Sequence, residues 1–211
     1  MKKGKNILKA KYMGILLVLS LILSVFTGCE VSEKQQGIPD SVDTIRVGNI
    51  YVEDDEMRYY FYNTQATYEA YYIAEDMELD WDSELQEGTS LREGVKSIIL
   101  DDICKREVII SFAEDYSIET DSDDVSEAEK MVETFFTETN PKLQSKINIS
   151  PLRLQEIFEK EILYKKVSEA MEAEEEGKTD EMYKNWKNAN NVTTGDKWHE
   201  LDFDEVILSG E

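Results

Sequence analysis

The sequence predicts a mainly α-helical fold with a small β element, and three observations support this prediction. Long segments between residues 54 and 189 carry apolar residues at helical spacing, and several of them open on residues that commonly cap helices. Short apolar alternations occur only near residue 45 and again after residue 190, and they are too brief to build a sheet of their own. No internal repeat is visible. We therefore expect a helical domain in which short strands from its N- and C-terminal ends form the β element.

The first residues are interpreted as a secretory signal. Five lysines precede an apolar run at residues 12–25, which is short for a membrane span of roughly 20 residues. The run closes at Cys29 in the way that bacterial lipoprotein signals do, although Phe26 stands where such signals usually carry leucine. By this resemblance, residues 1–28 are removed and Cys29 carries the lipid, which holds the protein at the extracytoplasmic face of the cell membrane. An uncleaved anchor is the alternative.

The composition is strongly acidic. There are 46 acidic and 23 basic residues, a formal net charge of −23, and loss of the five lysines of the signal leaves 18 basic residues and a charge of −28. Such a field repels nucleic acid and anionic lipid headgroups, so nucleic acid is excluded as a partner. A solvated, self-repelling surface explains the charge, and attraction of cationic polypeptide segments is the alternative.

The mature chain is predicted to hold one domain at residues 44–205, after a flexible polar tether at residues 29–43. The helices of this domain occupy residues 44–176, a returning segment occupies 177–205, and a tail follows at 206–211. A tight hairpin is expected around Gly48-Asn49. Helix starts are expected at four further places: at Asp54 or Asp55, at the capping box Ser90-x-x-Glu93, near Asp121 to Asp124, and at Ser150-Pro151. A shorter helix after Thr179 and another strand are expected in the returning segment, which Trp186, Trp198 and Phe203 would anchor on the earlier helices.

The predicted helix from residue 54 to about 75 carries an unusual number of aromatic residues. Seven fall on this one segment, more than a single buried stripe of a helix holds. In one interpretation Tyr60, Phe61, Tyr68 and Tyr72 serve the core, with the tyrosine hydroxyls reaching water. In the other, some rings line an apolar groove that contacts polypeptides. The residues selected for this contact surface are Tyr59, Phe61, Tyr62, Tyr71 and Tyr72.

The order of these segments resembles the N-terminal chaperone region of the SurA/PrsA-type extracytoplasmic foldases. The resemblance is carried by IRVGNIYVEDDEMRYYFYN, LREGVKSIILDDICKREVIISFAEDYSIETDSDDV, ISPLRLQEIFEKEILYKKVSEAM and, for the family's C-terminal segment, MYKNWKNANNVTTGDKWHELDF. It covers residues 45 to 203 and is one of pattern rather than of a catalytic motif. The resemblance implies a SurA-N-like helical chaperone domain that binds unfolded or secreted polypeptides.

The catalytic domain of that family is expected to be missing. Full-length relatives carry a parvulin-type prolyl isomerase domain between the long helix and the C-terminal segment, whereas here only residues 172–179 separate the two. This stretch is too short to fold as a domain. Parvulin sites resemble one another in a pair of histidines, and the chain has only His199. The sequence therefore predicts a protein that is not an enzyme.

No other motif indicates a cofactor or a metal. The acidic cluster of residues 121–124 lacks the glycine and distal glutamate of a calcium loop, and Cys104 stands among apolar residues without a nearby histidine, as a core thiol does. We therefore expect a membrane-anchored, non-catalytic lipoprotein with chaperone-like binding. A scaffold for one dedicated partner and a prolyl isomerase are the alternatives. The client and the oligomeric state are not indicated.

Overall fold

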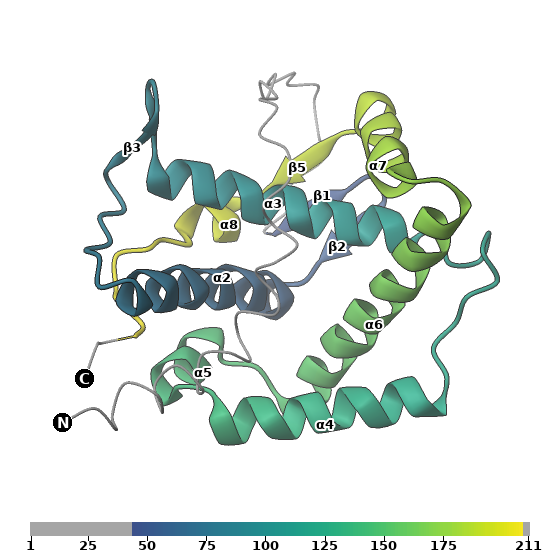
Figure 1. The fold of residues 1–211 in the computed structure, drawn as a ribbon, viewed down its shortest axis with the longest axis horizontal. Coiled ribbons are helices and arrows are strands. Elements are labelled where there is room, and N and C mark those ends of the chain that lie inside the picture. The colour runs from purple at the N-terminus through teal and green to yellow at the C-terminus, as the bar shows by residue number, and fades with distance from the viewer. Residues whose placement is uncertain (1–43, 209–211) are drawn as a thin grey trace.

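Helices dominate residues 44–208, which are the part of the chain that the computed structural model describes (Figure 1). The predicted mainly α fold with a small β element is confirmed. The helices are α2 (Asp54–Ala74), α3 (Leu91–Ile110), α4 (Ser122–Glu138), α5 (Pro141–Ile147), α6 (Pro151–Glu174), α7 (Lys178–Ala189) and α8 (Asp196–Glu200). The strands are β1 (Ile45–Val47), β2 (Ile50–Val52), β3 (Glu84–Gln86), β4 (Thr89–Ser90) and β5 (Val192–Thr194). The signal, Cys29 and the tether lie outside the described residues.

The predicted hairpin and the returning strand form one small antiparallel sheet in the order β2-β1-β5. Val47 pairs with Ile50, so Gly48 and Asn49 form a two-residue turn, and Gly48 takes the positive φ of 61° that such a turn requires. A Cβ at Gly48 would lie 3.1 Å from the Trp186 ring of α7. Glycine therefore serves both the turn and the close approach of α7 to the sheet.

Side-chain caps begin three of the long helices where the sequence predicts them. Ser90 and Glu93 form a capping box at α3, Asp121 and Asp124 form another at α4, and the Ser150 hydroxyl accepts from the backbone N–H of Arg153 at 3.2 Å. These contacts satisfy N–H groups that have no partner within the helix.

The predicted cap of α2 is wrong, because its N-cap is Glu53, whose side chain makes no capping hydrogen bond. Asp54 and Asp55 lie instead in the first turn, where their negative charges interact favourably with the helix dipole.

The sequence analysis does not predict three short elements, the β3–β4 hairpin, α5 and α8. The hairpin of β3 and β4 links α2 to α3, and α5 follows α4 directly. Asn140 and Pro141 mark the end of α4, but they also start α5: the Asn140 side chain accepts from the backbone N–H of Lys142 at 2.8 Å, and proline occupies the first turn. Asn140 and Pro141 therefore both end α4 and begin α5.

Helix α2 separates two hydrophobic cores, and this position explains its aromatic content. Met57 and Phe61 face the core built on α3, the sheet and the C-terminal segment, whereas Tyr59, Ala66 and Ala70 face the core built on α4, α5 and α6. A helix that is buried on two sides holds more aromatic residues than one with a single buried stripe. The interpretation of these rings as core residues is correct for most of them.

The returning segment packs on the earlier helices, as expected. Trp198 and Phe203 are buried in the first core, where the Phe203 ring stacks on Trp81 at 4.2 Å and on Phe61 at 4.5 Å between centroids. Trp186 is only half-buried.

The predicted tail needs correction, because the fold extends beyond residue 205. Ile207 and Leu208 are 2% and 9% exposed and pack in the second core. Because their side chains reach a core, Ile207 and Leu208 belong to the domain. Residues 205–208 are too few for their sequence pattern to show this.

Candidate functional site

The five aromatic residues predicted to form a contact surface do not lie together on one. Phe61 is fully buried, and Tyr59 is 9% exposed, with its ring edge-on to Phe158 at 5.8 Å. Both therefore belong to the core, which corrects their assignment. Tyr62 and Tyr72 are half-buried, and Tyr71 is 42% exposed. The correction follows from α2 lying between two cores, which buries Tyr59 and Phe61 and leaves Tyr71, near its C-terminal end, as the most exposed of the five.

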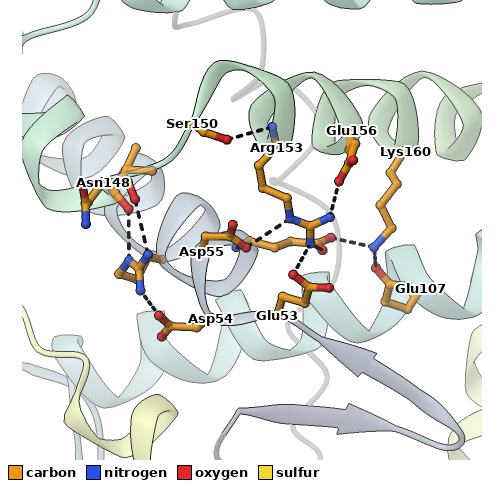
Figure 2. Close-up of polar contacts among 12 residues, drawn as sticks. Glu53, Asp54, Asp55, Glu107, Asn148, Ser150, Arg153, Glu156 and Lys160 are labelled. Carbon is orange, nitrogen blue, oxygen red and sulfur yellow. Dashed lines mark hydrogen bonds and ion pairs between the residues drawn. The ribbon is translucent and has the colours of Figure 1, made fainter.

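The densest polar network of the described chain joins α2, α3 and α6 (Figure 2). The Lys160 ammonium lies between two buried carboxylates, at 2.7 Å from Glu56 and 2.5 Å from Glu107. The Arg153 guanidinium reaches Glu56 at 3.2 Å and Asp55 at 3.2 Å. Sequence reasoning did not find this network, because its members are spread over about a hundred residues.

The charges of this network are mutually dependent. Burial raises the pKa of Glu56, and the charge of Glu107 adds to this, while Lys160 and Arg153 oppose it. Burial alone would lower the pKa of Lys160, but Glu56 and Glu107 outweigh it and raise that pKa. Lys160 and Arg153 are thus paired with the carboxylates of this network. The arrangement clamps three helices together rather than offering a free acid or base.

An apolar hollow lies between α4 and α6. Its volume is about 330 Å³, and its lining is Glu127, Lys130, Met131, Thr134, Phe135 and Phe158. Two buried phenylalanine rings form its apolar part together with the flexible side chain of Met131, which is half-buried. In Figure 1, α4 runs along one edge of the molecule, with α6 rising from it. The hollow therefore combines an apolar surface with an adaptable wall at the edge of the fold.

A second feature holds an extended segment of the chain against α2. The Glu69 carboxylate, 3% exposed, accepts from the backbone N–H of Ile207 at 2.8 Å and of Leu208 at 2.6 Å. The amide of Gln65 donates to the backbone carbonyl of Glu205 at 2.8 Å and to Glu69 at 2.8 Å. Gln65 and Glu69 lie one turn apart on α2, and both side chains are buried. No local signal in the sequence marks this pair, because other polar and charged residues also lie on α2.

Two lysines of α5 complete this arrangement. Lys146 pairs with the Glu205 carboxylate at 2.6 Å, and the Lys142 ammonium donates to the backbone carbonyl of Val206. We call the site formed by Gln65 and Glu69 of α2 and Lys142 and Lys146 of α5 the α2–α5 cradle.

The remaining candidate chemistry is not assembled into a reactive site. Cys104 is 1% exposed, and burial raises the pKa of its thiol to about 12, so the reactive thiolate is disfavoured. The exposed His199 ring lies 3.2 Å from the Thr194 hydroxyl. Between residues 44 and 208, no group of histidine, cysteine, aspartate and glutamate side chains is arranged to hold a metal ion. Within the same residues, no helix has the length and apolar character needed to cross a membrane.

Comparison of the chain with protein-family models, with curated proteins and with solved structures returns no match. The resemblance to the SurA/PrsA-type foldases therefore remains a prediction from the sequence.

Proposed function

We propose that the protein is a lipoprotein, anchored through Cys29 at the extracytoplasmic face of the cell membrane, that binds unfolded or secreted polypeptides without catalysis. The observation that carries this proposal is the apolar hollow between α4 and α6, with Met131, Phe135 and Phe158 in its wall. The sequence resemblance to the SurA/PrsA-type chaperone region supports it.

The hollow suits weak and exchangeable contact with apolar side chains. A volume of about 330 Å³ lies at the small end of ligand sites and accommodates one or two side chains rather than a folded partner. Burying about 100 Å² of apolar surface there contributes about 2.5 kcal/mol before the costs of association. Such a contact holds a chain briefly and releases it. Methionine adapts to side chains of different shape, which favours many clients over one.

The charge of the protein favours a particular kind of client. With a formal net charge of −23, the chain attracts polypeptide segments in which basic residues flank the apolar ones. Both charge signs are present among the residues that line the hollow, in Glu127 and Lys130. The electrostatic contribution weakens as salt is raised, whereas the apolar contact persists.

The proposal is tested by suppression of aggregation of an unfolded, reduced protein substrate, measured by light scattering. Met131→Asp places a charge in the hollow and is expected to lower the suppression at least threefold. The matched control is Ser126→Asp, which adds the same charge at an exposed position of α4 outside the hollow. Thermal unfolding of both variants shows that the fold is kept.

Two results would contradict the proposal. Failure of the unmodified protein to suppress aggregation at any molar ratio would remove the chaperone-like function. Equal activity of Met131→Asp and Ser126→Asp would remove the hollow as the binding site. Capture of one stoichiometric partner in place of many would instead support a dedicated scaffold.

A further inference from the structure

We propose that the α2–α5 cradle is a binding site for an extended segment of another polypeptide, in which an acidic residue is followed two and three positions later by aliphatic residues. The chain's own residues 205–208 fill the cradle when no such segment is bound. This site is separate from the hollow between α4 and α6, so the inference goes beyond the proposed function.

The cradle recognises the backbone of the segment that it holds. Gln65 donates to the carbonyl of Glu205, and Glu69 accepts from two successive N–H groups, those of Ile207 and Leu208. Side chains of the receptor thus take the place of a neighbouring strand. Backbone groups are common to every polypeptide, so this mode of binding does not require the segment to belong to the same chain.

The buried carboxylate of Glu69 makes an occupant necessary. It is 3% exposed, and burying a carboxylate is unfavourable unless hydrogen-bond donors satisfy it. Apart from the amide of Gln65, its donors within residues 44–208 are the N–H groups of the bound segment. An apolar residue at this position would pack in the core without such a demand. A glutamate there is matched to the N–H groups of a peptide backbone, whichever chain supplies them.

Side-chain contacts define the sequence that the cradle prefers. Glu205 pairs with Lys146 at 2.6 Å, which favours an acidic residue at this position of the segment. The next residue, Val206, is 57% exposed, so the cradle does not select the side chain at this position. Ile207 and Leu208 then enter the second core, in which Ala66 and Ala70 supply small side chains from α2. The preferred segment therefore reads acidic, any residue, aliphatic, aliphatic.

The resident segment is held in a way that permits exchange. Residues 201–208 form neither a helix nor a strand, and Glu205, Ile207 and Leu208 bond through their backbones to side chains rather than to a ladder. A segment with few regular backbone hydrogen bonds opens locally at a lower free energy than the core does. Opening exposes the cradle while α2 keeps its other face in the first core. A competing segment at high local concentration can then replace residues 205–208 in the cradle.

The test uses the full chain and a fluorescent peptide of the sequence LDFDEVILSGE, followed by anisotropy. The double variant Ile207→Ser/Leu208→Ser weakens the resident segment and is expected to bind the peptide at least tenfold more tightly than the unmodified chain. Adding Glu69→Gln to it is expected to reduce this binding at least tenfold. A peptide with serine in place of its isoleucine and second leucine should not bind. Val206→Ser is the matched control and should behave as the unmodified chain does.

A double variant that unfolds cooperatively but does not bind the peptide would overturn the proposal. If the double variant does not fold, hydrogen exchange of the intact chain decides. The amides of Ile207 and Leu208 are then expected to exchange at least a hundredfold faster than the buried amides of α2. Exchange of both sets at the same rate would show that the segment opens only with the whole domain and would overturn the proposal.

Discussion

Replacing Lys160 by methionine is expected to destabilise the protein strongly. Lys160 bridges Glu56 and Glu107, which are 1% and 5% exposed. Glu56 keeps its contact with Arg153 at 3.2 Å after the replacement, but Lys160 is the cation paired with Glu107 within residues 44–208. One buried carboxylate is thus left without a counter-charge, which costs about 3 to 5 kcal/mol. We expect about 3 kcal/mol, because Lys160 is 30% exposed and water can partly replace it.

Urea unfolding measures this effect directly. With a slope of about 2 kcal/mol per molar urea, a loss of about 3 kcal/mol lowers the midpoint by about 1.5 M. The control is Lys165→Met on the same helix. Lys165 is 74% exposed, and its Nζ lies 4.0 Å from Oε1 of the exposed Glu169, which is a weak contact. Such a surface pair contributes about 0 to 1 kcal/mol. Adding Glu107→Gln to Lys160→Met removes the orphaned charge and should restore most of the loss.

The effect of Lys160→Met should also depend on pH in a defined direction. Burial raises the pKa of Glu56 above its value in the unfolded chain, and loss of Lys160 removes a charge that opposes this. A carboxyl group with a raised folded pKa destabilises the fold above that pKa and ceases to do so as the pH falls below it. The deficit of the variant should therefore be largest near pH 7 and shrink toward pH 4.5. A midpoint equal to that of Lys165→Met, or a deficit that grows on acidification, would refute this reasoning.

Three further predictions concern the returning segment, the lipid and catalysis. Trp198→Ala should lower the free energy of unfolding by about 3 to 5 kcal/mol, because the ring is 3% exposed. Trp186→Ala should lower it by less, because the Trp186 ring is only half-buried. Equal urea midpoints for the two variants would contradict the assigned burial. Cys29→Ala should move the protein out of the membrane fraction or leave it unprocessed, and an unchanged mature mass and membrane fraction would end the lipoprotein interpretation. The purified protein should not accelerate cis/trans exchange of a proline peptide, whose uncatalysed relaxation takes tens of seconds or more; acceleration that His199→Ala abolishes would promote the isomerase alternative.

Local signals were sufficient for the starts of α3, α4 and α6 and for the first turn. The capping residues Ser90, Asp121 and Ser150 each start a helix where the sequence predicts one, and Gly48 forms the turn of the hairpin. These features depend on backbone groups within a few residues of the side chain that satisfies them. They are therefore legible without knowledge of the rest of the fold.

The role of the tyrosine-rich helix could not be obtained from local pattern. The sequence shows that α2 has more aromatic residues than one stripe can bury, but it does not show how many cores the helix faces. The structure places α2 between two cores and so buries Tyr59 and Phe61, two of the residues that the sequence analysis selects for a contact surface. The hollow at Met131 and Phe158 combines two helices and has no counterpart in any single segment.

By itself, the sequence determined the mainly helical class, the main helix starts and the return of a C-terminal strand, because each depends on periodicity or on contacts between near neighbours. Only the tertiary structure decided which charges are buried together and where the segment after residue 205 goes. Lys160 meets Glu56 across 104 positions, and Glu69 meets Leu208 across 139. In a chain with 46 acidic residues, no local pattern distinguishes these two glutamates from the solvated ones. Their burial is a property of how the helices pack, and the cost of burying a carboxylate makes their partners necessary.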